Sequence, residues 1–406
     1  MKKLFSLFRM LSAAMLVCAA GSANAANVLF PTQTADKLQV VDISGETERH
    51  SIVAAGTEKV YQGHPTTVLS GDGKRLFCVW TAGHGGKCGP AAESLDSGRT
   101  WKRVDERLPK VYSQTHQNCP TLQKLSLPDG KERWLIFSRK GKWDRAAGSP
   151  GRLGIMASDD GGLAWRETGV FELPSSMPPT GFIRLKDGSY ALFGQERKDP
   201  KKQNIDANND MSIWMSVSND GGITWSERRK VAAADKKNLC EPFAFRSPDG
   251  KEICLLMREN RHTARSMMCF SRDEGKTWTK PVDTPWGLTG DRHQGVLLAD
   301  GRLVVAFRDM AQKSPTHGHF VAWVGSYDAI KSGETKDTYR VKLLHNYSGW
   351  DCGYPGVHLL PDGTILATTY CKYWKDKRKH SVVSTRFRVE ETDRMVAQRQ
   401  SGLSAK

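Results

Sequence analysis

The sequence predicts an all-β protein, a six-bladed β-propeller of four-stranded antiparallel blades, and two interleaved repeats support this prediction. The first repeat is an Asp-Gly turn between two largely apolar runs, as in "GVLLADGRLVVAFRD". This pattern is typical of a hairpin whose tight turn needs a positive φ. Successive turns lie 57, 58, 62, 51 and 62 residues apart, which indicates six similar units. The turn aspartates are Asp72, Asp129, Asp187, Asp249, Asp300 and Asp362.

The second repeat is an S-x-D-x-G-x-x-W motif, found as "SLDSGRTW", "SDDGGLAW", "SNDGGITW" and "SRDEGKTW". Its aspartate follows the first four Asp-Gly turns by 24, 31, 33 and 24 residues. Each unit is therefore expected to run through four strands, which makes one propeller blade. In such a turn the Asp accepts backbone N–H bonds, the Gly takes positive φ and the Trp packs between sheets. We expect these folding roles for Asp96, Asp160, Asp220 and Asp273.

Closure of the ring depends on the N-terminal segment. The last unit, from about Asp351 to Val389, shows only three strand-like runs, and "KLQVVDIS" or "HSIVAAG" can supply the fourth. We therefore expect one propeller domain over residues 26–389, closed by this segment, and a tail over residues 390–406. A seven-bladed ring is the alternative, because residues 27–60 could hold most of an extra blade.

The first 25 residues are typical of a secretory signal peptide. Lys2, Lys3 and Arg9 form a basic start, an apolar run covers about Leu11–Ala20, and Ala23–Ala25 is an A-x-A cleavage site. The mature chain is therefore expected to be secreted or periplasmic. No later apolar run approaches the ~20 residues that a membrane helix requires, so no membrane span is expected.

Charge and cysteine content restrict the partners. The mature chain carries a formal charge of +13, spread along its length, which favours polyanionic partners. Nucleic acid is not expected, because no basic run is interleaved with aromatics; acidic glycans fit better. No cysteine pair has C-x-x-C spacing, so a zinc site built from thiolates is not expected. No feature demands a metal or other cofactor, and calcium in a loop stays open. Eight cysteines permit disulfides whose pairing is open: Cys78, Cys88, Cys119, Cys240, Cys254, Cys269, Cys352 and Cys371.

The candidate site is expected where the inner strands of a propeller converge, at the start of each first strand and the end of each second strand. Polar and ionisable residues concentrate at these places. The candidates are His64, His84, Arg139, Gln195, Glu196, Arg197, Glu241, Arg258, Asp291, Arg292, His293, Arg308, Asp309, Asp351 and Tyr354.

Two of these candidates suit an anionic ligand. Arg258 and Arg308 end the second strands of consecutive blades, "LLMRE" and "VAFRD", so both guanidinium groups can point into one pocket. Planar bidentate pairing with a carboxylate is what a guanidinium does better than an ammonium. The alternative is that each arginine bridges to an acidic residue of a neighbouring blade.

The S-x-D-x-G-x-x-W motif is known as the Asp-box, and the whole chain resembles the sialidase superfamily of propellers. In that superfamily Asp-boxes lie on the rim away from the pocket. The resemblance implies that arginines hold a substrate carboxylate, that Tyr354 is the nucleophile and that Glu241 is its base. Substrate-binding roles are then expected for Arg258, Arg308, Arg292, Arg139, His293 and Asp351.

The first blade departs from the sialidase pattern. Sialidases begin it with an Arg-Ile-Pro stretch, followed soon by an acid/base aspartate, whereas this chain has "GHPTTV" and no such aspartate. His64 and His84 occupy this hairpin and can transfer protons near neutral pH. The pair resembles that of propeller polysaccharide lyases, in which two similarly spaced histidines work with a tyrosine and an arginine on uronate-containing glycans. Downstream, "LPDGKERWLIFSRKG" offers Arg139 but no tyrosine.

The sequence therefore favours an exo-sialidase-like glycoside hydrolase that removes a terminal acidic sugar. Its expected partner is an acidic glycan, either sialylated or uronate-containing. A lyase acting on uronate-containing polysaccharide and a glycan-binding propeller without catalysis are the alternatives.

Overall fold

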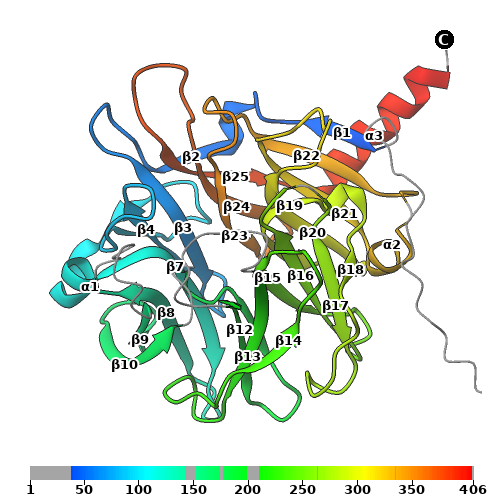
Figure 1. Ribbon diagram of the computed structural model, residues 1–406. Coiled ribbons are helices and arrows are strands. Elements are labelled where there is room, and N and C mark those ends of the chain that lie inside the picture. Colours follow the sequence, from blue (N-terminus) through cyan, green and yellow to red (C-terminus); the bar gives the residue numbers. More distant parts are fainter. Residues whose placement is uncertain are drawn as a thin grey trace, which may run out of the picture.

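Six β-sheets stand around a central axis in the computed structural model (Figure 1). The predicted six-bladed propeller is confirmed, and the seven-bladed alternative is not formed. The predicted signal peptide, residues 1–25, lies outside the described residues. The structure describes residues 38–141, 151–173, 177–198, 210–262, 264–333 and 335–404.

Blades 1 to 4 follow the chain in order. Blade 1 holds β3 (Gln62–Leu69), β4 (Leu76–Ala82), β5 (Ala91–Ser94) and β6 (Lys102–Arg103). Blade 2 holds β7 (His116–Ser126), β8 (Glu132–Lys140), β9 (Gly151–Ser158) and β10 (Arg166–Leu173). Blade 3 holds β11 (Gly181–Arg184), β12 (Tyr190–Arg197), β13 (Met211–Ser218) and β14 (Arg229–Ala232). Blade 4 holds β15 (Leu239–Arg246), β16 (Ile253–Glu259), β17 (Met267–Ser271) and β18 (Val282–Asp283).

Blades 5 and 6 both recruit the N-terminal segment. Blade 5 holds β19 (Gly290–Leu297), β20 (Arg302–Asp309), β21 (Phe320–Ser326), β22 (Tyr339–Leu344) and β1 (Gln39–Asp42). Blade 6 holds β23 (Gly353–Leu359), β24 (Ile365–Cys371), β25 (Ser381–Phe387) and β2 (His50–Ala54). The helices are α1 (Lys110–Thr115), α2 (Tyr327–Ser332) and α3 (Val389–Ser404), with 3-10 turns at Thr47–Arg49, Asp105–Arg107 and Trp286–Leu288.

The N-terminal segment joins two blades. Strand β2, from "HSIVAAG", pairs antiparallel with β25 and supplies the fourth strand of blade 6. Strand β1, from "KLQVVDIS", pairs parallel with β22 and gives blade 5 a fifth strand. The uniform four-stranded pattern expected from the sequence therefore has one exception. Strand β1 covers an edge of β22 that would otherwise present unpaired backbone groups.

The C-terminal residues differ from the expected tail, because Val389–Ser404 form helix α3. The Tyr339 hydroxyl donates to Asp393 at 2.7 Å, and Arg302 pairs with the same carboxylate at 2.9 Å. Met395 and Val396 pack against the core between blades 5 and 6. These contacts come from residues far apart in the sequence, so local patterning did not reveal the helix.

The turns of both repeats adopt the expected geometry. All six glycines of the Asp-Gly turns have positive φ. In each of these turns the Asp side chain accepts the backbone N–H two residues later, at 2.9 to 3.1 Å. In each Asp-box the Ser hydroxyl donates to the Asp and accepts the N–H of the glycine four residues after the serine.

In blades 2, 3 and 4 the Asp-box tryptophan packs against an aromatic ring of the preceding blade. The Trp165 ring lies 5.5 Å from that of Phe77, and the Trp278 ring lies 5.7 Å from that of Phe193. Both kinds of turn lie on one rim, since each first strand ends there and each third strand returns there. The start of every first strand lies at the opposite end of the axis, where the site was expected.

The described part of the chain contains no helix long and apolar enough to cross a membrane. All eight cysteines of the predicted mature chain are buried free thiols, so the possible disulfides do not form.

Substitution of two neighbouring glycines can measure how tightly the Asp-box of blade 2 packs. A Cβ at Gly162 would lie 2.8 Å from the Trp134 ring, whereas a Cβ at Gly161 would meet nothing within 4 Å. Both positions have positive φ, which costs alanine about 1–2 kcal/mol. We expect Gly162→Ala to lower the free energy of unfolding by about 1–3 kcal/mol more than Gly161→Ala, measured by urea denaturation. Equal losses of unfolding free energy in the two variants would show that the turn is not closely packed against blade 1 or blade 2.

Candidate functional site

Five of the six first strands carry a β-bulge near the axis, and each bulge holds a non-glycine residue with positive φ. Left-handed backbone costs such residues about 1–3 kcal/mol each and gathers at functional sites. Bulges also re-aim side chains, and here the five side chains converge from different blades. They are His64 (φ 51°), Cys119 (φ 45°), Glu241 (φ 47°), Arg292 (φ 58°) and Tyr354 (φ 61°).

Tyr354 and Glu241 form the centre of the site. The Tyr354 hydroxyl donates to Glu241 Oε1 at 2.5 Å, and Arg258 Nη1 donates to Glu241 Oε2 at 2.9 Å. Burial acts to raise the pKa of Glu241, but the charges of Arg258 and Arg292 and the tyrosine hydrogen bond outweigh it and lower that pKa. Burial, followed by the charge of Glu241, raises the pKa of Tyr354 well above its usual value. A neutral phenol therefore donates to an ionised carboxylate.

Arg292 lies against this pair with part of its guanidinium unsatisfied. Its Cζ lies 5.1 Å from the centre of the Tyr354 ring, and its Nη2 donates to Thr121 at 3.4 Å. Its Nε and Nη1 are buried and have no hydrogen-bond partner among the described residues. Such donors are costly in the resting protein and would stabilise negative charge that develops on a neighbouring oxygen.

The expected carboxylate clamp of Arg258 and Arg308 is already occupied by Asp291. Arg308 donates from Nε to Asp291 at 3.1 Å and also contacts it through Nη2. Its Nη1 donates to the Trp350 and Cys352 carbonyls, so all three nitrogens have partners. Arg258 Nε lies 3.0 Å from Asp291, which leaves its Nη2 without a partner among the described residues. The inter-blade bridge, the alternative interpretation, describes Arg258, which reaches Asp291 of blade 5, whereas Arg308 pairs with Asp291 inside its own blade.

Asp291 is the charge hub of the site. His262 Nε2 also lies 2.9 Å from its carboxylate. Burial acts to raise the pKa of Asp291, but the charges of Arg258 and Arg308 outweigh it and lower that pKa far below its usual range. Asp291 is therefore ionised at any working pH and holds Arg258 and Arg308 in position.

Asp351 is a second hub, at the mouth of the site. Tyr61 and Tyr370 each donate a hydroxyl to it at 2.9 Å. His84 Nδ1 and His380 Nε2 lie 3.3 and 3.2 Å from its carboxylate oxygens. Burial acts to raise the pKa of Asp351, and these hydrogen bonds and histidine charges overcome it and lower the pKa. The His84 side chain is 58% exposed, which places it where a substrate would enter.

His64 lies between the Asp351 hub and the Tyr354–Glu241 pair. Its ring centroid lies 4.7 Å from that of His84 and 4.7 Å from that of Tyr354. The Gly85 N–H donates to His64 Nδ1 at 3.2 Å, so a neutral ring carries its proton on Nε2. Burial, followed by the charge of His84, lowers the pKa of His64 well below its usual value. His64 is thus a neutral hydrogen-bond donor beside the tyrosine.

Two expected site residues stand apart from this cluster. His293 donates from Nε2 to the Leu288 carbonyl at 2.8 Å and packs 4.9 Å from the Phe307 ring, as a core histidine does. Arg139 is buried at the end of β8 with its Nε unpartnered, and burial lowers its pKa. No contact within the described residues joins Arg139 to Tyr354. The structure brings together His64, His84, Glu241, Arg258, Arg292, Arg308, Asp351 and Tyr354.

Sequence reasoning missed several members of the site. Cys119 occupies the same bulge position in blade 2, and Tyr61, Tyr370, His262 and His380 complete the two hubs. One sequence signal could have located Cys119, because four of the five bulge residues precede a proline. These dipeptides are His64-Pro65, Cys119-Pro120, Glu241-Pro242 and Tyr354-Pro355.

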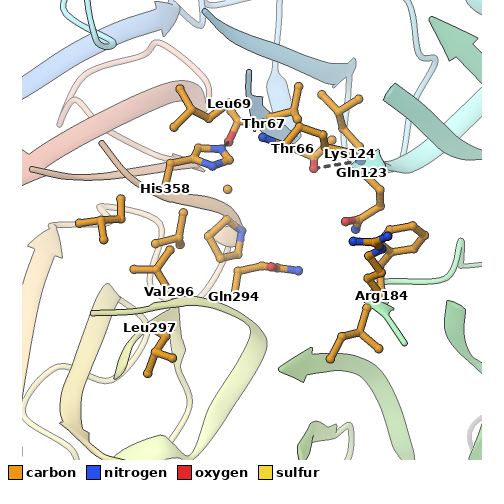
Figure 2. Close-up of a pocket in the computed structure, with 18 of the residues that line it drawn as sticks. Thr66, Thr67, Leu69, Gln123, Lys124, Arg184, Gln294, Val296, Leu297 and His358 are labelled. Carbon is orange, nitrogen blue, oxygen red and sulfur yellow. Dashed lines mark hydrogen bonds between the residues drawn. The ribbon is translucent and has the colours of Figure 1, made fainter. Parts of the chain in front are cut away.

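A separate cavity of about 650 Å³ lies around the axis beyond the bulges, toward the Asp-Gly turns (Figure 2). Its walls come from the later residues of the first strands, such as Thr67 of β3 and His358 of β23. It does not include Tyr354, Glu241 or either hub. Within the described residues, no group of three or more His, Cys, Asp or Glu side chains is arranged to hold a metal ion.

Comparisons with known proteins agree with this architecture. A family model of BNR repeat-like domains matches residues 203–329, which include the Asp-boxes at Asp220 and Asp273. Among curated protein sequences, none matches the chain. The family match and the structural neighbours together support the expected likeness to the sialidase superfamily of propellers.

Several solved structures share the fold at low sequence identity. A protein of unknown function from Dyadobacter fermentans is 17% identical, with a TM-score of 0.62 over 83% of this chain and 98% of that one. The α-L-arabinofuranosidase Arb93A of Fusarium graminearum is 13% identical, with a TM-score of 0.59 over 84% and 98%. The NanB sialidase of Streptococcus pneumoniae is 12% identical, with a TM-score of 0.53 over 84% and 71%. The fold is therefore one that glycoside hydrolases use.

Removal of the Asp291 charge should destabilise the protein. Asp291→Asn leaves Arg308 buried without its carboxylate, which we expect to lower the free energy of unfolding by about 3–5 kcal/mol in urea denaturation at neutral pH. Asp249→Asn, on an exposed Asp-Gly turn, is the control and should change little.

The same variant has a pH signature. Because the folded protein lowers the pKa of Asp291, its stabilisation is present above the ordinary carboxyl range and is lost as pH falls toward the folded value. The difference between wild type and Asp291→Asn should therefore shrink in acid. A difference that stays constant from neutral to acidic pH would contradict the assigned charge.

Proposed function

We propose that this protein is an exo-acting glycosidase of the sialidase type, which removes terminal acidic sugars with Tyr354 as nucleophile and Glu241 as its base. The hydrogen bond of 2.5 Å between the Tyr354 hydroxyl and Glu241 carries the proposal. Tyrosine nucleophiles are a known departure from the usual carboxylate pair of glycosidases. The sialidase among the structural neighbours supports the same assignment.

The geometry fits the chemistry of a tyrosine nucleophile. As the Tyr354 oxygen attacks the anomeric carbon, its proton passes to Glu241 Oε1, and the bond from the anomeric carbon to the leaving oxygen breaks as that oxygen takes a proton from water. The resulting hydroxide cleaves the bond between Tyr354 and the sugar, and Glu241 returns its proton to the Tyr354 oxygen. The Arg292 guanidinium over the ring stabilises the oxygen as it loses the proton. Burial alone would hold the phenol neutral, so the base and the cation are both needed.

Recognition of an acidic sugar is assigned to Arg258. Asp291 and Glu241 engage its Nε and Nη1, and its Nη2 is available for a substrate carboxylate. The side chain is 13% exposed, against 4% for Arg308. Arg308 then serves as a positioning residue that holds Asp291. The +13 charge of the predicted mature chain favours an anionic substrate as well.

A uronate lyase is the second candidate, favoured by the contacts of the two histidines. The His64 and His84 rings lie 4.7 Å apart, and Tyr354 of blade 6 supplies the tyrosine that the segment "LPDGKERWLIFSRKG" of blade 2 lacks. A lyase removes the proton next to a uronate carboxylate, and a cation must neutralise that carboxylate as the carbanion forms. The two reactions differ in product, because only the lyase forms an unsaturated uronate.

Tyr354→Phe tests the nucleophile. We expect purified wild-type protein to release free sialic acid from sialyllactose, and Tyr354→Phe to lower the rate by roughly three orders of magnitude or more. Tyr327→Phe is the matched control, since it removes a buried hydroxyl bonded to Glu252 and remote from the site. Full activity of Tyr354→Phe would overturn the nucleophile assignment.

His84→Ala separates the hydrolase from the lyase. His84 contacts Asp351 and Tyr61 and makes no hydrogen bond with Tyr354 or Glu241, so a tyrosine-based hydrolase should keep most of its activity. A histidine-dependent lyase should lose its activity. Parallel assays measure sialic acid from sialyllactose and ultraviolet absorbance from uronate polysaccharides. New absorbance that disappears in His84→Ala would replace the first candidate by the second, and binding without either product would leave a glycan-binding propeller.

A further inference from the structure

The cavity near the Asp-Gly rim, here called the far chamber, has the size and walls of a ligand site. Its volume of about 650 Å³ falls within the roughly 300–1,000 Å³ of small-molecule pockets. Five of the six blades contribute to its walls, and Figure 2 shows their side chains around an open centre. The far chamber is lined by residues 66–69, 122–124, 126, 182–184, 190, 294, 296–297 and 355–359.

The described lining of the far chamber carries positive charge, and one of its two cations has no ion pair with a described residue. Its described lining includes Lys124 and Arg184 and no Asp or Glu. Lys124 lies 3.4 Å from Glu132, which is outside the lining, whereas Arg184 makes no side-chain hydrogen bond or ion pair with a described residue. Burial, together with the charge of Lys124, lowers the pKa of His358 to about 4, so this ring is neutral and the two cations set the charge. An anionic ligand fits such walls.

Two side-chain amides in the lining suit a sugar better than a simple anion. Gln123 of blade 2 and Gln294 of blade 5 come from opposite sides of the ring, and Figure 2 shows both side chains at the cavity. Neither amide is hydrogen-bonded to another described side chain or backbone group, so both keep their donors and acceptors for a ligand. The donor and acceptor of a single amide match two vicinal hydroxyl groups of a sugar, and each wall offers one such amide.

An aromatic wall adds apolar surface to these polar groups. Phe182 and Tyr190 of blade 3 stack with ring centroids 5.3 Å apart, and the Tyr190 hydroxyl is used up by the backbone of Ser126. The aromatic residues therefore offer carbon faces to the chamber. Aromatic surface, free amides and cations together are suited to an acidic sugar ring.

The far chamber is separated from the candidate active site. Arg292 of blade 5 reaches Thr121 of blade 2, so its side chain spans the axis between the two. Tyr354 lies on one side of this crossing, and its neighbour Pro355 lines the far chamber. A sugar held in the far chamber is therefore out of reach of Tyr354 and Glu241.

We propose that the far chamber is a second, non-catalytic site that binds an acidic sugar unit of an oligosaccharide. The inference does not depend on the catalytic proposal, because none of its residues belongs to the Tyr354 cluster. Occupation of the chamber would hold the enzyme on a glycan surface and raise the local concentration of further chain ends at the active site.

The test uses full-length protein with the Tyr354→Phe substitution, so that turnover does not complicate binding. Isothermal titration calorimetry with sialyllactose and with trigalacturonate should show binding of at least one of them at a site additional to the candidate active site. Arg184→Gln combined with Lys124→Gln should weaken that site by about tenfold or more, since charge-assisted hydrogen bonds are lost. Lys131→Gln combined with Lys251→Gln, an equal loss of charge on exposed turns of the same rim, is the matched control and should leave binding unchanged.

Two further ligands and one activity measurement complete the test. Lactose should bind the far chamber much more weakly, and inorganic phosphate should not displace the oligosaccharide at comparable concentration. The double substitution in otherwise wild-type protein should leave kcat on a small soluble substrate unchanged. Binding that is unaffected by the double substitution, equal binding of lactose, or full displacement by phosphate would each overturn the proposal. Loss of catalysis with retained chamber binding would count against the catalytic proposal alone.

Discussion

The left-handed backbone at the bulges of five first strands is the constraint on which the site depends. An ordinary strand alternates its side chains between the two faces of a blade, so it would not send them along the axis. The bulge does so at His64, Cys119, Glu241, Arg292 and Tyr354, at a cost of about 1–3 kcal/mol each. The rest of the propeller must offset this cost. Asp-boxes and Asp-Gly turns lie on the opposite rim and stabilise the packing of neighbouring blades. The bulged ends of the strands are therefore available for the candidate site.

Charge balance is the second requirement, because the site buries several ionised groups together. Three acids, Asp291, Glu241 and Asp351, face three arginines, Arg258, Arg308 and Arg292, so the formal charges of the described cluster balance. A buried ion pair is weak evidence for stability, but removal of one partner is costly. The cluster is therefore better understood as a fixed electrostatic environment. It keeps Glu241 ionised beside a neutral phenol and leaves one arginine edge for an anion.

The fold could be predicted from the sequence because each blade repeats two turn motifs whose chemistry is local. The Asp-Gly turns and Asp-boxes each satisfy their own backbone groups within a few residues. The pairing of β1 with β22 and the docking of α3 on Tyr339 were not predictable in this way, since both join segments about 50 to 300 residues apart. The candidate site likewise has some features that the local sequence predicts and others that depend on distant contacts. Tyr354 and Glu241 were found from their place in the repeat, whereas the contact of Arg258 with Asp291 depends on side-chain geometry between blades 4 and 5.

Arg292 links the reactive pair to the rest of the axis. Its position over the Tyr354 ring and its bond to Thr121, on the far side of the ring of blades, give it two roles. It is the only cation of the described cluster with two buried nitrogens that have no partner, so its field is directed at whatever negative charge forms beside it. Because the same side chain spans the axis, it also isolates the reacting oxygen from the polar chamber beyond. A shorter or neutral residue in place of Arg292 would both weaken the electrostatic field and open the axis. These two roles explain why a strained backbone is tolerated there.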